Sequence, residues 1–306
     1  MQDPNPHVDQ SAEDSFAWLA CREHWLDLSR GAVIMGILNV TPDSFYDGGR
    51  YLNTSEALKR AEAMLIEGAR IIDVGGASSR PRGSIYGEGA GAVSSECEID
   101  RVVPVIKAIR RSFPEAIVSV DTFSPVVTSS VLDAGAHMIN DISGLQNGVA
   151  SAEYAGEAGA AYVLMHSIRQ QGDIVHAAEY SNVVTAVYTS LKESIERASD
   201  AGIHSIIVDP GFGFGKLPSD NLRLVNHLDL FAELGYPILI GISRKSTVGQ
   251  VLSKDSVPIP VEDRLFGSLG VTAVAVLRGA KIIRTHDVRG TLEMIQGMEA
   301  VLNVPA

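Results

Sequence analysis

The amino-acid sequence predicts an α/β fold, a single (β/α)8 barrel of parallel strands preceded by a short N-terminal extension. Short apolar runs alternate with longer amphipathic stretches eight times along the chain, as one barrel requires. Several amphipathic stretches end in Gly-Ala or Ala-Gly just before the next apolar run, which is typical of a helix stop repeated in each unit. The length of 306 residues is common for a barrel that forms one domain.

The predicted strands are the apolar runs, which are short and rich in β-branched residues. In chain order they are Val33–Leu38, Arg70–Val74, Ile117–Val120, Ala136–Ile139, Ala161–Met165, Ser205–Val208, Pro237–Ile240 and Ala280–Ile283. The predicted helices lie between them and include "SEALKRAEAMLIEGA" and "SECEIDRVVPVIKAIRRSF". Thr54 and Ser94 directly precede these two stretches, so they are the candidate helix N-caps.

Two regions make up the predicted domain organisation. Residues 1–30 form an extension that we expect to pack on the barrel as a short helix or hairpin, and residues 31–306 form the barrel itself. The Gly-rich segment "RPRGSIYGEGAGAVSS" lies inside the repeat, so we interpret it as a mobile loop between a strand and a helix. A doubly wound open sheet is the second choice of fold, and it would need fewer strands and an edge.

Composition and charge exclude several classes of function. The net charge of −12 disfavours a broad surface for nucleic acid or for an anionic membrane, which leaves small molecules as the expected partners. Cys21 and Cys97 lie far apart, without the spacing of a zinc site or a disulfide framework. Because we find neither a signal peptide nor a membrane-spanning run, we expect a cytoplasmic protein.

The segment "IIVDPGFGFGKLP" has the appearance of a phosphate-binding loop, but its spacing fits none. Pro210 stands where a P-loop needs its first glycine, and Leu217 follows Lys216 where a hydroxyl is required. Lys216 also occupies the position of the third glycine of a dinucleotide fingerprint. The segment is therefore an apolar run that ends at Asp209, and Lys216 is interpreted as a solvated residue.

Nearly every apolar run ends at polar side chains. In a parallel barrel these positions share one rim, the C-terminal face on which barrel active sites are built. One such aspartate, for example Asp121, could be only a helix N-cap, but eight positions together indicate a polar site. We interpret His166 as structural, and His137 as an ordinary surface or helix-end residue. The rim set is Asn39, Asp73, Asp121, Asn140, Asp141, His166, Asp209, Ser243, Arg244, Lys245, Arg284 and His286.

The residue types at this rim indicate their ligands. Asp121, Asn140 and Asp209 offer carboxylate and amide edges that suit a flat, amide-like heterocycle. The cations and donors of the set, with Arg80 from the following loop, suit a diphosphate or a carboxylate. Asn39 is the candidate ligand for a hard cation such as Mg²⁺, which keeps several waters and binds substrate phosphates.

At this point the chain resembles the dihydropteroate synthase family over roughly residues 33 to 302. The resemblance depends on seven motifs in family order: "MGILNVTPDSFYDGG", "IIDVGGASSRP", "VSVDTFSP", "INDISG", "DPGFGFGK", "GISRKS" and "RTHDV". It implies a homodimeric TIM barrel that joins dihydropterin-methyl diphosphate to 4-aminobenzoate and releases diphosphate, with Mg²⁺ as cofactor. The implied mechanism is dissociative, with a pterin-methyl cation that the aniline nitrogen attacks.

The resemblance also implies a role for each matching position. The implied catalytic residues are Asp47, Arg80, Asp121, Asp209 and Lys245. Pterin binding falls to Asp121, Asn140, Met165, Asp209 and Lys245, and diphosphate binding to Asn39, Asp73, Arg284 and His286, with Asn39 also at the metal. The 4-aminobenzoate subsite would comprise Phe45, Ser79, Arg80, Pro81, Phe214 and Ser246.

The chain departs from the family pattern in the second loop, and three alternative functions are also considered. Ala77, Ser79 and Arg82 replace the Glu, Thr and Gly of the usual second loop, which bears on substrate closure and sulfonamide fit rather than on the pterin site. A methyltetrahydrofolate-binding methyltransferase subunit would share the pterin pocket but lack the diphosphate cations. The others are a non-catalytic pterin-binding paralogue and a Schiff-base aldolase that uses Lys245.

Overall fold

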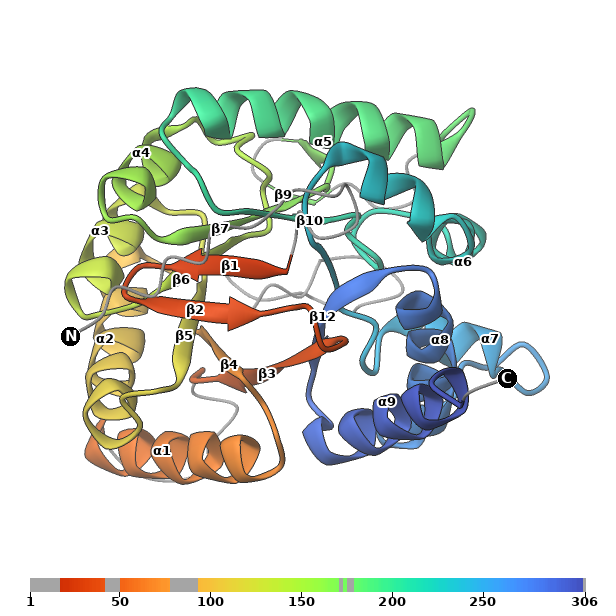
Figure 1. The fold of residues 1–306 in the computed structure, drawn as a ribbon, viewed down its shortest axis with the longest axis horizontal. Helices are drawn as coiled ribbons and strands as arrows, with labels where there is room; N and C mark the ends of the chain where they lie inside the picture. Colours follow the sequence, from red (N-terminus) through yellow and green to blue (C-terminus); the bar gives the residue numbers. More distant parts are fainter. Residues whose placement is uncertain (1–16, 42–49, 78–92, 171–172, 175–178, 305–306) are drawn as a thin grey trace.

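The computed structural model describes residues 17–41, 50–77, 93–170, 173–174 and 179–304. Eight strands, each parallel to its neighbours, close into a barrel, which confirms the predicted fold and excludes the open sheet. Figure 1 shows the helices arranged around these strands. The barrel strands are β3 (Val33–Asn39), β4 (Ile71–Gly75), β5 (Ile117–Asp121), β6 (Met138–Asp141), β7 (Ala161–Met165), β10 (Ile206–Asp209), β11 (Ile238–Ile240) and β12 (Ala280–Thr285).

The described helices follow the strands in the expected alternation. Ser94 caps α2 as predicted, because its Oγ accepts a hydrogen bond from the backbone N–H of Cys97 at 3.3 Å. Thr54 lies inside α1, so its prediction as an N-cap is wrong. No Pro or Gly separates Thr54 from Arg50, and the helix extends one turn further back. The helices are α1 (Arg50–Ile66), α2 (Ser95–Ser112), α3 (Pro125–Asp133), α4 (Ala150–Glu157), α5 (Val183–Asp200), α6 (Pro218–Asn226), η2 (Leu228–Leu234), α7 (Ser246–Val251), η3 (Val261–Arg264), α8 (Leu265–Leu277) and α9 (Val288–Leu302).

Two apolar clusters form most of the core. The larger one lies between the strands and the surrounding helices and includes Ile72, Val118 and Ile139. The second joins residues near the beginnings of the barrel strands, such as Met35 and Ile71, to side chains of an N-terminal hairpin. This second cluster fills the end of the barrel at which the strands begin, so the carboxyl ends of the strands are left for a site.

The N-terminal hairpin consists of the antiparallel strands β1 (Trp18–Cys21) and β2 (His24–Asp27) and crosses the barrel in Figure 1. Leu19, Cys21 and Leu26 are its buried contacts with the second cluster. Arg22, at the turn, donates to the carbonyls of Leu132 at 2.9 Å and Ala136 at 3.1 Å. The hairpin therefore closes the barrel end opposite the rim.

Two further features complete the described fold. A short pair, β8 (Arg169–Gln170) and β9 (Asp173–Ile174), lies between β7 and α5. Among the described residues, no helix is both long enough and apolar enough to cross a membrane.

Candidate active site

Arg284, near the end of β12, lies between two buried carboxylates at the rim. Its Nε donates to Asp73 Oδ2 at 2.7 Å, and one terminal nitrogen donates to Asp121 Oδ2 at 2.9 Å. Asp73 is fully buried and Asp121 is 8% exposed. Charge-assisted bonds of this kind fix a guanidinium in place, so β4, β5 and β12 together present one preorganised cation.

Asp73 is the centre of this network rather than an open ligand. Besides Arg284, its carboxylate accepts hydrogen bonds from Ser119 Oγ at 2.7 Å and from Asn140 Nδ2 at 3.2 Å. Ser119 was missed by the sequence reasoning, although it lies two residues before Asp121 and therefore shares its face of the strand. Asp73 thus orients Arg284 and Asn140.

Burial changes the acidity of the charged groups around this cation. It raises the pKa of Asp121 to about 7, although Arg284 opposes that rise. Burial also raises the pKa of Asp209, with Lys245 opposing it. It lowers the pKa of Lys245 to about 7, with Asp209 opposing the decrease. The rim therefore holds one carboxyl, Asp121, and one ammonium, Lys245, that titrate near neutral pH, which is common at catalytic sites.

Lys245 lies directly before α7 and extends over the loop that follows β10. Its ammonium donates to the carbonyl of Phe212 and lies 4.3 Å from the centre of the Phe214 ring. Across the same loop, Asp209 accepts a hydrogen bond from the backbone N–H of Gly211 at 2.7 Å. The "GFGFG" segment is thus one wall of the site beside Asp209.

A small apolar cluster forms another part of the rim. It contains Ile142, Met165 and Phe214, with Phe123 packed against it. Met165 and Phe214 were predicted as site residues, whereas Ile142 and Phe123 were not. Both missed residues lie within two positions of a predicted polar residue, Asp121 or Asn140, which is the signal that could have identified them. This surface suits the face of a flat heterocycle.

His286, predicted to bind diphosphate, contacts Ser243 at the rim. Its Nδ1 lies 3.1 Å from Ser243 Oγ, and that hydroxyl also accepts from the His286 backbone N–H at 3.2 Å. The tautomer of the ring sets the direction of this bond, because the hydroxyl can donate to Nδ1 or accept from it. Because burial lowers the pKa of His286 to about 4, the ring is neutral at pH 7 and offers a hydrogen bond rather than a charge.

Arg244, a predicted cation of the rim, and Lys216, from the neighbouring loop, both bind protein groups. Arg244 adopts a positive φ of 57° and forms a two-point ion pair with Asp287. Lys216, interpreted as solvated, is only 5% exposed. Its ammonium is directed into the protein, where it donates to three backbone carbonyls, so that interpretation is wrong.

The remaining predicted residues divide into two groups. Asn39 ends β3 with an exposed side chain, and an ideal Cβ on Gly75 would lie 3.4 Å from its Oδ1 and 3.8 Å from Asp121 Cβ. Asn39 and Asp121 therefore flank the same glycine at the rim. Ser246 begins α7 next to Lys245. Outside the described residues lie Phe45, Asp47, Ser79, Arg80 and Pro81.

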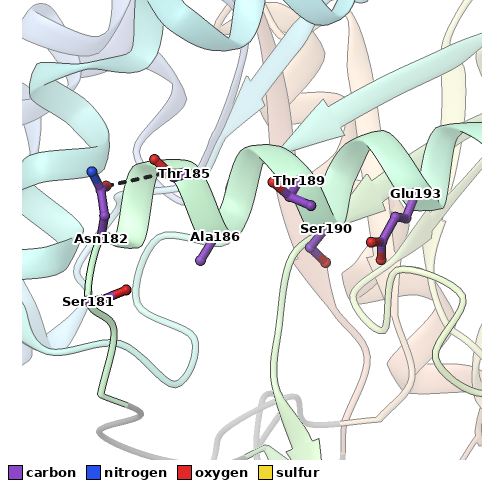
Figure 2. A pocket seen from close by; sticks show the side chains of 7 residues that line it. All are labelled: Ser181, Asn182, Thr185, Ala186, Thr189, Ser190 and Glu193. Carbon is purple, nitrogen blue, oxygen red and sulfur yellow. Dashed lines mark hydrogen bonds between the residues drawn. The ribbon is translucent and has the colours of Figure 1, made fainter.

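A pocket on α5 is a poorer candidate. Figure 2 shows it along the helix, with Asn182 capping the first turn. None of the predicted site residues contributes to its lining, and Glu193 is its one ionisable side chain. The lining consists of Ser181, Asn182, Thr185, Ala186, Thr189, Ser190 and Glu193.

Glu23, His24 and His137 form a possible metal-binding group at the closed end, where their ligand atoms lie within 4.8 Å of one another. His137 is fully buried and directly precedes β6, so its interpretation as an ordinary surface or helix-end residue is wrong. Its Nδ1 accepts the N–H of Val118 at 2.9 Å, which places the ring hydrogen on Nε2, the nitrogen 3.5 Å from Glu23 Oε1. Arg110 already binds that oxygen at 2.6 Å. The hydrogen on Nε2 and the bond from Arg110 both occupy atoms that a metal ion would need as ligands.

Comparisons with known proteins agree with this arrangement. The model of the pterin-binding enzyme family matches residues 35–286. Dihydropteroate synthase of Escherichia coli (strain K12) is 44% identical over 280 residues, which cover 91% of this chain and 94% of that protein. Among solved structures, Xanthomonas albilineans dihydropteroate synthase with 4-aminobenzoic acid superposes with a TM-score of 0.84 at 38% identity, covering 95% of this chain and all of that one (100%). The same enzyme in complex with 7,8-dihydropteroate gives a TM-score of 0.81 at 36% identity, covering 94% and 100%. With this match over most of its length, the chain belongs to the dihydropteroate synthase family of pterin-binding enzymes.

Proposed function

We propose that the rim site condenses (7,8-dihydropterin-6-yl)methyl diphosphate with 4-aminobenzoate to give 7,8-dihydropteroate and diphosphate. The observation that carries the assignment is Arg284, a fixed cation between Asp73 and Asp121 at the mouth of a barrel of this family. This arrangement places a guanidinium, which can bind an anionic leaving group, beside carboxylates that can stabilise a cationic intermediate. A related enzyme whose structure contains 7,8-dihydropteroate supports the choice of product.

The pterin subsite comprises the strand-end residues and the apolar cluster. Asp121, Asn140 and Asp209 pair with the amino-pyrimidine edge, while Met165 contacts the ring face. All four are at most 8% exposed and lie at the ends of barrel strands, so the subsite is rigid before substrate arrives. Lys245 reaches the same ring from the next loop.

Electrostatic stabilisation explains how these residues promote loss of diphosphate. As the carbon–oxygen bond breaks, positive charge develops on the pterin-methyl group. Ionised Asp121 and Asp209 stabilise that charge in a buried environment, where such interactions are strong. The aniline nitrogen of 4-aminobenzoate then attacks the methylene carbon and loses a proton. Deprotonated Lys245 is within the site to accept it, since its pKa is about 7.

The diphosphate subsite comprises Asn39, Arg284 and His286. Arg284 supplies the charge, and neutral His286 supplies a hydrogen bond. Asp73 acts through Arg284. Asn39 offers an exposed amide oxygen, a ligand type that would suit Mg²⁺. Bound there, Mg²⁺ would neutralise charge on the leaving group.

The aminobenzoate subsite lies beside Phe214 and Ser246. Phe214 lies within van der Waals reach of the apolar cluster, and Lys245 lies over its ring, so an aromatic acid can stack there with its carboxylate near Ser246. Phe45, Asp47, Ser79, Arg80 and Pro81 complete this subsite in the proposal, from the first and second loops. Ala77, Ser79 and Arg82, which replace the usual Glu, Thr and Gly of the family, would alter how a sulfonamide fits this subsite.

We further propose a homodimer formed through α8. Phe266, Val274 and Leu277 form an exposed apolar stripe with Gly270, at the spacing of one helix face, and Phe266 is 82% exposed. Val257 and Val261 extend the exposed apolar surface on the preceding segment. A second copy of the chain is the occupant that fits, and sedimentation equilibrium should give a dimer that Phe266→Glu converts to monomer. A monomeric wild type would contradict it.

The experiment that tests the reaction measures diphosphate release from dihydropterin-methyl diphosphate with and without 4-aminobenzoate. We expect release that depends on 4-aminobenzoate and yields 7,8-dihydropteroate in equal amount. No release with either mixture, despite tight pterin binding, would indicate the non-catalytic paralogue instead. Methyl transfer from methyltetrahydrofolate without diphosphate release would indicate the methyltransferase subunit.

A further inference from the structure

The loop between β10 and α6 is wedged between two neighbouring strand ends. Gly211, Gly213 and Gly215 have φ of 72°, 78° and 71°, a backbone region that glycine adopts without strain. An ideal Cβ on Gly211 would lie 1.9 Å from the carbonyl oxygen of His166, and one on Gly213 would lie 2.5 Å from Lys245 Cδ. The loop therefore approaches the end of β7 on one side and Lys245 on the other.

Lys216 fastens this loop from inside the protein. Its ammonium donates to the carbonyl oxygens of Gly211 at 2.8 Å, His166 at 3.2 Å and Phe214 at 3.2 Å. An ammonium has three hydrogens, so each can serve one of these carbonyls. One side chain thus joins the beginning of the loop, its last aromatic residue and the neighbouring strand end.

Asn221 of α6 fixes the middle of the same loop. It is fully buried, and its Oδ1 accepts the N–H of Gly213 at 2.8 Å. Its Nδ2 donates to Thr247 Oγ1 at 2.9 Å, on the helix that follows Lys245. With Asn221 holding Gly213 and Lys216 holding Phe214, the backbone beneath the Phe214 ring has little freedom to move.

We propose that Lys216 is a positioning residue for the second substrate, because it holds Phe214 at the place where the aminobenzoate ring stacks. The inference depends on the proposed subsite beside Phe214. The ammonium of Lys216 forms no hydrogen bond with Asp121, Asn140 or Asp209. Its positive charge does act on Asp209, but Lys245 has the larger such effect on that carboxyl. Loss of Lys216 should therefore affect 4-aminobenzoate more than the pterin.

Replacement of Lys216 by methionine tests this role, since methionine fills similar space without donating hydrogen bonds. The carbonyls of His166 and Phe214 would lose this donor, and that of Gly211 would keep only the N–H of Phe214, so the loop would shift to find new donors. We expect the KM for 4-aminobenzoate to rise about tenfold or more while the KM for the pterin diphosphate stays within about twofold. The matched control is Lys192→Met on the exposed face of α5, which should change neither constant. Equal increases in both KM values, or none, would overturn the proposal.

A double-mutant cycle with Phe214→Leu shows whether Lys216 acts through Phe214. In the Phe214→Leu background, Lys216→Met should add less than about twofold to the KM for 4-aminobenzoate, because the ring that it positions is gone. A full, additive increase would overturn the inference. If Phe214→Leu alone changes nothing, the proposed subsite is wrong and the inference falls with it. If Phe214→Leu raises that KM but Lys216→Met does not, the subsite stands and only the inference fails.

Lys216→Gln extends the test to the case in which the methionine variant does not fold. The glutamine amide keeps two donors, so it can still bind part of the carbonyl set. We expect an intermediate rise in the KM for 4-aminobenzoate, again with the pterin KM nearly constant. A folded glutamine variant with wild-type constants for both substrates would contradict the role of Lys216.

Discussion

An arginine lies among ionisable side chains at each end of the barrel. At the rim, Arg284 donates to Asp73 and Asp121, which are both buried. At the closed end, Arg110 donates to Glu23 at 2.6 Å and to the carbonyl of Pro114 at 3.0 Å, and the Glu23 side chain is 54% exposed. At the rim two carboxylates bind one guanidinium, whereas at the closed end one carboxylate, that of Glu23, binds the Arg110 guanidinium.

This difference separates a functional cluster from a structural one. An unbalanced buried carboxylate is costly in the empty protein, and the raised pKa of Asp121 reflects that cost. A ligand that develops positive charge removes the imbalance. At the closed end the Glu23 carboxylate is half-exposed and already bound to Arg110, so this cluster serves to attach the hairpin.

Removal of Mg²⁺ by chelation should give the largest difference between the rim and the closed end of the barrel in their effect on turnover. EDTA should abolish turnover and Mg²⁺ should restore it, because a diphosphate leaving group needs its charge neutralised. The variant Glu23→Gln should show the same Mg²⁺ requirement as the wild type, since we place no ion at the closed end. Full activity in EDTA would remove Asn39 from the metal site, and a changed requirement in the variant would assign a metal role to Glu23.

Substitution of one carboxylate at each end should separate them next. Asp121→Asn should lower turnover by about 10² or more, because a charge opposite a developing cation is lost. Glu23→Gln, which removes the corresponding charge at the closed end, should leave turnover within about twofold of wild type. Steady-state kinetics on both variants gives the answer. An Asp121→Asn enzyme within about threefold of wild type, a difference of roughly 0.7 kcal/mol in the activation free energy, would remove Asp121 from catalysis.

The hairpin should affect stability without affecting catalysis. Arg22→Ala removes two hydrogen bonds to the carbonyls of Leu132 and Ala136, so we expect a loss of about 2–3 kcal/mol in the free energy of unfolding. The KM values of folded enzyme should not change, because the rim contacts remain. Urea unfolding and kinetics measure the two effects separately. A changed KM for either substrate would show that the two ends are coupled.

The sequence predicted the barrel and the rim because both depend on local periodicity. Nearly every apolar run ends at a polar residue, and parallel strands bring those ends together whatever the conformation of the loops. Contacts between loops carry no such signal. Lys216 has the sequence context of a solvated lysine, and only the return of its loop against β7 buries it. His137 was misinterpreted for the same reason, since the hairpin that covers it lies more than a hundred residues earlier.

The pH dependence of stability should have opposite signs at the two ends. The pKa of Asp121 is raised to about 7 in the folded protein, so its contribution to stability is present at acidic pH and is lost as pH rises through 7. The pKa of His137 is lowered to about 4 by burial, so its contribution is present above about pH 6.5 and is lost as pH falls. His24, Glu23 and Arg110 face that ring at the closed end.

Two variants resolve these opposing contributions. Between pH 7 and pH 5 the free energy of unfolding of Asp121→Asn should fall more steeply than that of the wild type, and that of His137→Gln less steeply, each by about 1–2 kcal/mol. The glutamine oxygen can still accept the N–H of Val118, so the second variant keeps the buried hydrogen bond while removing the titration. Buried His166 and His286 titrate alike in all three proteins and cancel in the comparison. Urea unfolding at a series of pH values measures the slopes. A carboxyl with a raised pKa and an imidazole with a lowered pKa must change the slope in opposite directions. If both variants change the slope in the same direction, the rim and the closed end do not differ in the way proposed.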